Sequence, residues 1–436
     1  MRFFSSCVDF RRLYVNVGAM YNFLKGRLVV VRLCLLVTTL MLVTIGIITI
    51  YSVGHPAEPS PVSRVEDDLG GYWERQLIFA GLGLVGLIIV NLISYRRFGA
   101  ISYWIFALGL IALSYLLFSR YIIPLPFAPE SKTFAHRWFV FHNRLPKVQP
   151  SEFFKLAYIL TLAWYLRYRS NYRNFKALIG PFVLTLLPMM LILLEPDLGT
   201  VLLMMPVLFT MLFVAGAKVK HLLIIILMAV LVSPLLWGKM RPYQRIRISS
   251  VLLQNSWIRE KAEQHEWLGE LLVGTKFTEI QWKTDWGYHL IRSKYAVASG
   301  SVNSGTGYGY RRGPFVKYNF LGERHNDFIF AVIAQQWGFV GCLGLMILYV
   351  IIVGCGLKIA ANNTDPFGRL LAVGIVAMFV VEVIINIGMT MGIMPITGLT
   401  LPLVSYGGSS LLVSMMAVGL LNNVGRCRPF SLARKT

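Results

Sequence analysis

Three groups of polar side chains in this sequence stand beside long apolar stretches, where charged groups are costly and are functional candidates for that reason. The first group lies in residues 149–155 (QPSEFFK), which open an apolar stretch. Pro150 suits the first turn of a helix, and Lys155 lies one turn further in. Its ammonium group could point into a cavity and pair with a diphosphate or a carboxylate. The alternative is plain helix capping, with a lysine that snorkels to a polar surface.

The second group is the tight turn of residues 195–200 (EPDLGT), which separates two apolar stretches. Glu195 and Asp197 place two carboxylates in this turn, and that is expensive in an apolar setting unless water or cations are near. These carboxylates could orient Lys155, Arg137 or a bound metal ion. Alternatively, Asp197 simply caps the helix that follows it.

The third group, residues 322–330 (GERHNDFIF), lies where a long polar segment meets an apolar stretch. Asn326 or Asp327 would be a good N-cap for the helix that starts there. Asp327, close to the apolar Phe328, is also a candidate general base, because a positioned carboxylate can accept a proton from a reacting hydroxyl. No spacing in this segment is typical of metal ligands.

A fourth segment, residues 392–410 (GIMPITGLTLPLVSYGGSS), is uncharged and rich in glycine and proline. Irregular backbone at membrane depth is tolerated only against protein or against a water-filled cavity. The segment therefore indicates the wall of a cavity more than a reacting group.

The elements that hold these groups are predicted to be membrane-spanning helices. The 436 residues are 56% hydrophobic and 14% charged, against about 25% charged in an average soluble domain. A large soluble helical core is excluded, because buried soluble helices rarely stay apolar all round for so long. We expect an all-α integral membrane protein with about ten transmembrane helices, near residues 29–52, 75–94, 98–118, 151–167, 177–195, 199–215, 219–237, 328–355, 367–391 and 402–423.

The charge distribution predicts how these helices are oriented. Lys and Arg total 42 against 20 Asp and Glu, a net charge of +22 that would suggest nucleic acid in a soluble protein. Here the excess lies in the tails and in alternate short loops, which marks that side as cytoplasmic and predicts no nucleic-acid partner. The predicted parts are cytoplasmic tails 1–28 and 425–436, a membrane domain 29–424, and a large outer loop 238–327 between helices 7 and 8.

Two shorter loops are also predicted on the outer side. One is acidic (Glu66, Asp67 and Asp68), and the other, residues 119–150, is basic and aromatic and includes Arg137. The basic loop breaks the positive-inside bias, which fits an anionic substrate that arrives from outside. Snorkelling of long side chains at the lipid headgroups is the alternative. The five cysteines show no spacing typical of a disulfide framework or a zinc site.

In this order, the four segments and residues 287–294 (GYHLIRSK) resemble the SEDS family of shape, elongation, division and sporulation proteins. The resemblance implies a GT-C-like membrane fold in the bacterial cytoplasmic membrane. It also implies an inverting peptidoglycan glycosyltransferase that polymerises lipid II into β-1,4 glycan strands, with a lipid diphosphate as the leaving group. Residues 323–325 (ERH) are more similar to the elongation branch (RodA) than to the division branch (FtsW). The implied partner is a class B penicillin-binding protein, a single-span transpeptidase.

The resemblance also suggests roles for particular residues. Asp327 corresponds to the aspartate regarded as catalytic, and a divalent cation, Mg²⁺ or Mn²⁺, is a candidate cofactor with no site assigned. The residues expected to bind substrate, from the cavity and the matching motifs, are Arg137, Lys155, Glu195, Asp197, Arg324, His325 and Ser409.

The sequence departs from the family pattern at several positions. Gly322 replaces a usual proline, Asn326 replaces a usual threonine, and residues 134–136 (FAH) replace the usual glycine before Arg137. The outer segment 251–286 is longer than the family pattern, and residues 257–268 within it are predicted to form an amphipathic helix on the membrane or against a partner.

Two alternatives to an enzyme stay open. A lipid II flippase would use the same cavity without breaking a bond, and it predicts that Asp327→Asn leaves polymer formation intact. A noncatalytic membrane scaffold for a penicillin-binding protein predicts that Lys155, Asp197 and Asp327 can all be replaced so long as the protein assembles.

Overall fold

The computed structural model describes most of the chain, with gaps at both ends and in four loops. Predictions about Arg324, about the acidic loop at 66–68 and about most of the two tails lie outside the described residues. The described residues are 28–57, 69–123, 125–128, 137–141, 147–168, 175–318 and 325–426.

Ten apolar helices lie at the ten predicted stretches, so the prediction of an all-α, multi-span protein is confirmed. Within the described residues, seven spans are long and apolar enough to cross a membrane, and α6, α8 and α19 are shorter, with 17 residues each. The ten helices are α2 (Val29–Gly54), α3 (Tyr72–Leu92), α5 (Ser102–Tyr121), α6 (Pro150–Leu166), α7 (Ile179–Leu194), α8 (Leu198–Val214), α9 (Val219–Trp237), α17 (Ile329–Asn362), α18 (Pro366–Thr390) and α19 (Gly408–Val424).

Local sequence accounts for several helix boundaries. Pro150 and Pro366 occupy the first turns of α6 and α18, where a missing N–H costs nothing. Asp365 caps α18 by accepting a hydrogen bond from a backbone N–H of its first turn. The tenth span starts later than predicted, at Gly408, because residues 401–406 form an irregular turn instead of helix.

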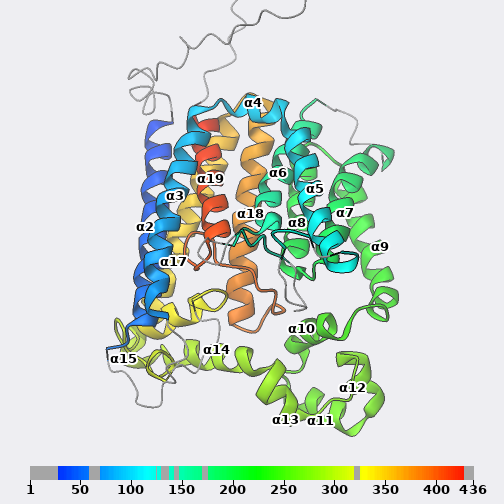
Figure 1. Cartoon of the computed structure of the whole chain (residues 1–436), viewed down its shortest axis with the longest axis vertical. Coiled ribbons are helices and arrows are strands. Elements are labelled where there is room, and N and C mark those ends of the chain that lie inside the picture. Colours follow the sequence, from blue (N-terminus) through cyan, green and yellow to red (C-terminus); the bar gives the residue numbers. More distant parts are fainter. Residues whose placement is uncertain are drawn as a thin grey trace, which may run out of the picture.

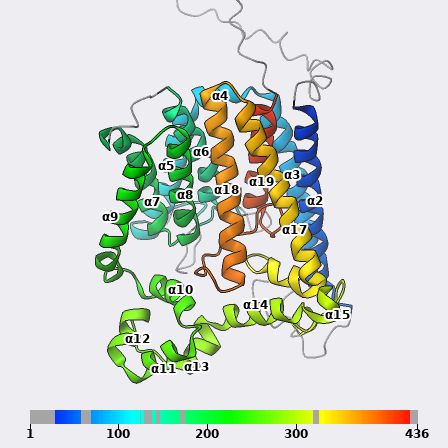
Figure 2. The same ribbon diagram turned by 180° about the vertical axis from the view of Figure 1, so that it is seen from behind.

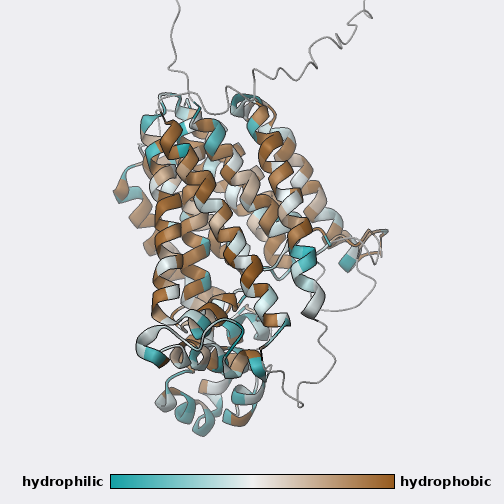
Figure 3. Ribbon diagram, turned by 90° about the vertical axis from the view of Figure 1, so that its left-hand side faces the viewer, coloured by the Kyte–Doolittle hydropathy of each residue, from teal (hydrophilic) through white to brown (hydrophobic). Residues whose placement is uncertain are grey.

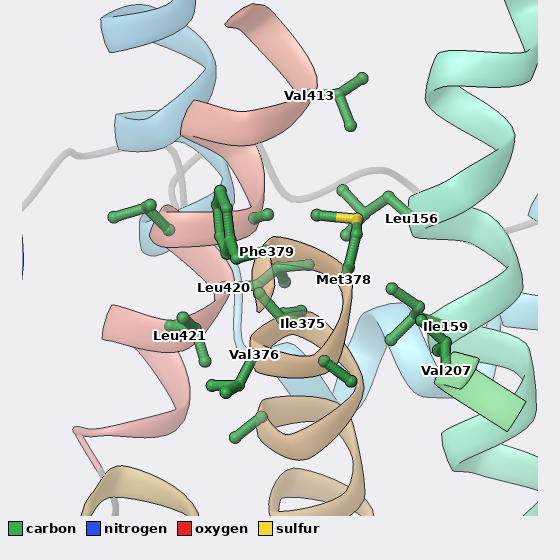
Figure 4. Close-up of a cluster of buried hydrophobic side chains, with 14 of the residues drawn as sticks. Leu156, Ile159, Val207, Ile375, Val376, Met378, Phe379, Val413, Leu420 and Leu421 are labelled. Carbon is green, nitrogen blue, oxygen red and sulfur yellow. The ribbon is translucent and has the colours of Figure 1, made fainter. Parts of the chain in front are cut away.

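Helix α18 is the centre of the bundle, and α9 lies at its edge. In the most apolar part of α18, 78% of the residues are buried, against 6% in α9. Figure 4 shows the packing around α18, where side chains from α6, α8 and α19 meet those of α18 itself. A central helix can carry polar groups away from lipid, and α18 does so.

The remaining helices lie at the two ends of the bundle. The short helix α4 (Tyr95–Ala100) lies at the same end as the start of α2 and the end of α19 (Figure 1). The segment between α9 and α17 lies at the opposite end, and Figure 2 shows it below α17 and α18. In Figure 3 the bundle is mainly hydrophobic and that lower segment is mainly hydrophilic. Its helices are α10 (Pro242–Leu252), α11 (Ser256–Gln264), α12 (Glu266–Val273), α13 (Glu279–Gln281), η6 (Trp282–Trp286), α14 (Tyr288–Ser299), α15 (Val302–Gly305) and α16 (Pro314–Lys317).

Candidate functional site

Asp197 joins the first two polar groups. Its Oδ2 atom accepts hydrogen bonds from the Ser151 and Thr200 hydroxyls, both at 2.9 Å, and from Gln149 Nε2 at 3.3 Å. The Thr200 N–H donates to Oδ1 at 3.3 Å. Asp197 therefore caps α8 and also fastens the start of α8 to the start of α6.

Ser409 lies beside the same junction. Its hydroxyl accepts a hydrogen bond from the Gln149 N–H at 3.0 Å, which brings the first turn of α19 against the first turn of α6. Next to it, the hydroxyls of Thr400 and Ser410 are 2.7 Å apart. The segment of residues 392–410, called the Gly/Pro segment here, is therefore a neighbour of the 149–155 group, although about 250 residues separate them in the sequence.

Arg137 approaches the 195–200 turn through the backbone. Its Nε donates to the Glu195 carbonyl at 3.1 Å, and its Nη2 donates to the Pro196 carbonyl. The Glu195 side chain is buried, and neither of its carboxylate oxygens has a hydrogen-bond partner among the described residues. The turn thus presents a guanidinium group and an unpaired buried carboxyl group at the same place.

Lys155 lies between two carboxylates, and neither of them is the Glu195 or Asp197 that was predicted to orient it. Its Nζ is 2.7 Å from Glu152 Oε2 and 2.6 Å from Glu382 Oε1. The three side chains are between 2% and 9% exposed, so Lys155 does not reach a polar surface and the snorkelling alternative is wrong. In this structure Lys155 has carboxylates as partners and links α6 to α18.

Asp327 lies against the Gly/Pro segment. Its carbonyl accepts a hydrogen bond from Asn386 Nδ2 at 2.9 Å, and the same nitrogen donates to the Leu399 carbonyl at 2.7 Å. A Cβ atom at position 398 would be 3.4 Å from Asp327 Oδ2. Gly398 has a φ of +77°, a conformation that glycine adopts without strain. A side chain at position 398 would therefore contact the carboxylate, which glycine leaves uncovered.

Arg247 of α10 is a charged neighbour of Asp327 that the sequence analysis did not single out. Its Nη1 donates to the Thr397 carbonyl at 3.4 Å. Burial lowers the pKa of Arg247 and the nearby Arg137 lowers it further, while Asp327 and Asp197 act in the opposite direction. Arg137, Asp327 and Asp197 therefore each lie within electrostatic range of Arg247. The signal in the sequence was the basic run at 241–247, at the start of the outer loop.

His325 lies in an aromatic cluster next to Asp327. Its ring centroid is 4.7 Å from that of Tyr72 and 5.5 Å from that of Tyr406. The Tyr406 N–H donates to the His325 carbonyl at 2.9 Å. The entry to α17 is thus packed against α3 and against the Gly/Pro segment.

Buried polar side chains hold the Gly/Pro segment in its irregular path. Gln76 of α3 donates to the Ser405 carbonyl at 3.1 Å, and the Ser405 hydroxyl donates to the Asn326 carbonyl at 2.7 Å. Tyr349 of α17 donates to the Pro402 carbonyl at 2.6 Å. The segment satisfies its backbone with protein partners, as non-helical backbone at membrane depth must.

The chemistry available here is proton acceptance beside bound negative charge. Asp327 and Asp197 supply carboxylates, and Arg137 and Arg247 supply guanidinium groups that suit phosphate oxygens. Six of the seven predicted substrate-binding residues, and Asp327, fall in the described part of the chain. The contact between the starts of α6, α8 and α19 brings together four of them: Arg137, Glu195, Asp197 and Ser409. Lys155 lies one turn further along α6, and His325 lies in the aromatic cluster next to Asp327.

The comparisons with known proteins agree with this arrangement. The family described as "Cell cycle protein", which comprises FtsW, RodA and SpoVE, matches residues 32–428. The chain belongs to this family. The SEDS resemblance and the multi-pass location in the bacterial cytoplasmic membrane are thereby confirmed.

The names of individual relatives show which branches of the FtsW/RodA/SpoVE family this chain is similar to. Peptidoglycan glycosyltransferase RodA of Treponema pallidum is 33% identical, over 89% of this chain and 96% of the relative. Stage V sporulation protein E of Bacillus subtilis is also 33% identical, over 90% and 96%. Relatives named RodA and stage V sporulation protein E thus have the same sequence identity to this chain, and the RodA-like interpretation agrees with the first of them.

Solved structures show the same fold. One is described as "Structural coordination of polymerization and crosslinking by a peptidoglycan synthase complex"; it has a TM-score of 0.66 and 30% identity, over 90% of this chain and 96% of that chain. The Rod shape determining protein RodA of Thermus thermophilus has a TM-score of 0.58 and 28% identity, over 90% and 95%.

Proposed function

We propose that this chain is a peptidoglycan glycosyltransferase that polymerises lipid II into β-1,4 glycan strands on the outer face of the cytoplasmic membrane, for cell elongation. Relatives at 32–33% identity are named peptidoglycan glycosyltransferase RodA and MrdB. The observation that carries the mechanism is the Asp327 carboxylate, held beside Gly398 within electrostatic range of Arg247.

The reaction needs a base and a site for a departing diphosphate. A sugar 4-hydroxyl attacks the anomeric carbon of the donor, the bond to the lipid diphosphate breaks, and the configuration inverts. Asp327 takes the hydroxyl proton, and Arg247 and Arg137 bind the diphosphate as its negative charge develops. Lys155 takes a different part from the one first expected: it is paired with two carboxylates, so it positions α6 and does not bind the diphosphate.

A shallow and open apolar groove on the surface of α5 is the surface on which we place the isoprenoid chain of such a substrate. Its volume is about 400 Å³, and it lies near the outer end of α5, where Arg120 donates to the Leu194 carbonyl at 3.1 Å. Lipid in this groove would have its diphosphate near the 195–200 turn. The groove is lined by Leu110, Ile111, Ser114, Tyr115, Phe118 and Leu125.

A divalent cation remains a proposal without a protein site. No group of three metal-ligating side chains gathers within the residues that the structure describes. We therefore assign no protein ligands to a metal ion among those residues. An Mg²⁺ or Mn²⁺ ion would arrive with the diphosphate, because Mg²⁺ commonly binds through substrate phosphates.

The proposed protein partner is a class B penicillin-binding protein that cross-links the glycan. The support is the similar structure whose description joins polymerization and crosslinking in one peptidoglycan synthase complex. A single-span transpeptidase would receive each strand on the side of the membrane where it is made.

Polymerisation of purified lipid II tests the proposal. The wild type, Asp327→Asn and Asp285→Asn are compared with a cognate penicillin-binding protein whose transpeptidase is blocked. Asp285 is exposed in the outer segment and is the matched control. We expect polymer from the wild type and the control, and a rate about 10²–10⁴ lower from Asp327→Asn, the usual effect of losing a general base.

The other outcomes separate the alternatives. Equal polymer from all three proteins would remove Asp327 from the chemistry. No polymer from any of them, while a known polymerase succeeds in the same mixture, would refute the enzyme and leave a flippase or a scaffold. Elution of Asp327→Asn as a single monodisperse peak in detergent excludes misfolding as the cause of its loss.

A further inference from the structure

The outer segment 242–286 folds around a small core of its own. This segment, called the outer module here, comprises α10, α11, α12, α13 and η6. Its core is separate from that of the bundle and contains Leu253, Ala262, Leu272, Val273, Phe277 and Trp282. A packed core fixes the orientation of the helices around it, so the same side chains of the module always face outward.

Two hydrogen bonds fasten the outer module to the outer end of α9. The indole N–H of Trp237, the last residue of α9, donates to the Leu271 carbonyl of α12 at 2.7 Å. Arg245 of α10 donates through Nη2 to the Gly238 carbonyl at 2.7 Å. Helix α12 is therefore held at the level where α9 leaves the membrane.

Helix α9 presents lipid-facing surface up to that level. Leu235 and Leu236 are 74% and 55% exposed, immediately before Trp237. On α12, Trp267 and Leu271 are 66% and 47% exposed, and residues four apart in a helix lie on one face. Exposed apolar side chains of α12 therefore belong to a helix that is held next to the exposed apolar end of α9.

Charge does not explain a membrane contact of this module. Residues 242–286 contain six Lys and Arg and six Asp and Glu, in a chain whose net charge is +22. Anionic headgroups attract segments with an excess of basic residues, and this module has no such excess. Tryptophan and leucine at the boundary between headgroups and acyl chains provide a contact that needs no charge.

We propose that the Trp267–Leu271 face of α12 inserts into the outer leaflet of the bilayer and anchors the outer module there. The occupant is lipid and not a second protein, because the Trp237–Leu271 hydrogen bond holds α12 next to the exposed apolar end of α9, which faces lipid. The proposal concerns a membrane contact and does not rest on the proposed enzymatic activity.

The module contains a matched control for this face. Trp257 is 64% exposed, close to the value for Trp267, but it belongs to α11. Helix α11 lies farther from α9 than α12 does, in both views (Figures 1 and 2). Exposed glutamates occur on both helices, so the distance from α9 is what distinguishes the two tryptophans. The single amphipathic helix predicted over 257–268 is divided at His265 into α11 and α12, and of these two described helices only α12 is held against α9. Trp257 is therefore expected to face water.

Site-directed quenching tests the proposal directly. Trp267→Cys and Trp257→Cys are made in a background whose five native cysteines are replaced by alanine, labelled with one fluorophore, and reconstituted as full-length protein in nanodiscs. We expect quenching by acyl-chain nitroxide lipids to be roughly twofold stronger at 267 than at 257, and quenching by aqueous iodide to be stronger at 257.

Salt and a partner protein separate the remaining possibilities. The lipid quenching at 267 should not change between about 0.1 M and about 1 M NaCl, where the Debye length falls from about 10 Å to about 3 Å. Equal lipid quenching at both positions would overturn the proposal. So would strong iodide quenching at 267 that disappears only when a penicillin-binding protein is added, because the face would then be a protein-docking surface.

Discussion

Replacing Lys155 by methionine tests whether the buried charges between α6 and α18 stabilise the bundle. The change removes one positive charge and keeps an unbranched side chain. The contacts of Nζ with Glu152 and Glu382 measure 2.7 and 2.6 Å, so the two carboxylate oxygens are at most 5.3 Å apart. At an effective dielectric constant of about 20, two negative charges at that distance repel by about 3 kcal/mol. Broken buried ion pairs typically cost about 3–5 kcal/mol, and we expect a loss in that range.

Unfolding in mixed micelles titrated with SDS measures this loss as a free energy of unfolding. The comparison is between the wild type, Lys155→Met, and a charge-free triple variant with Lys155→Met, Glu152→Gln and Glu382→Gln. The triple variant should recover most of the stability, because neutral amides do not repel each other and carry a smaller desolvation penalty. Lys358→Met, at an exposed lysine, should stay within about 0.5 kcal/mol of the wild type. A loss below about 1 kcal/mol for Lys155→Met, or a triple variant no more stable than the single one, would refute the electrostatic reasoning.

Three further substitutions test the site. Arg247→Met should lower the polymerisation kcat about 10²–10³-fold, as the loss of one donor to developing charge does, whereas Arg241→Met, at an exposed arginine, should not. Gly398→Ala should lower polymerisation without unfolding the protein, because a left-handed backbone costs about 1–2 kcal/mol and the new methyl group lies 3.4 Å from Asp327 Oδ2; Gly354→Ala, in open space, is the control. Asp197→Ala should lower stability by about 0.5–2 kcal/mol in the same SDS titration, through loss of the α8 cap.

Most of the fold could be predicted from the sequence because each membrane-spanning helix is encoded by a local stretch of apolar residues. An uninterrupted apolar stretch of about 20 residues forms a helix in a membrane, since a helix satisfies its backbone hydrogen bonds internally. The one large boundary difference, the start of α19 at Gly408, falls in a stretch whose apolar residues look helical. Hydrogen bonds from Gln76 and Tyr349, distant in sequence, hold those residues in an irregular turn instead.

The site was predicted less completely, because its pairings join distant segments. The cap formed by Asp197 was predicted, since its signal lies within a short motif. The alternative, that Asp197 orients Lys155, is wrong, because the partners of Asp197 in the 149–155 group are other side chains. Glu382 was missed, although a single carboxylate inside an apolar stretch is itself a signal of function. Its partner Lys155 is 227 residues away, and no local pattern connects the two. The catalytic assignment of Asp327 stays a prediction until the polymerisation assay is done.

One face of α18 connects the two halves of the site. Glu382 and Asn386 are four residues apart, so their side chains leave the helix on the same side. Glu382 pairs with Lys155 of α6, and four residues further on Asn386 binds the carbonyls of Asp327 and Leu399. The start of α6 is in turn fastened to Asp197 through Ser151. The distance between the proposed base and the 195–200 turn is therefore set through α18 and the first turns of α6. This explains why two buried polar residues, which are costly inside a membrane, lie one turn apart on the most buried helix of the bundle.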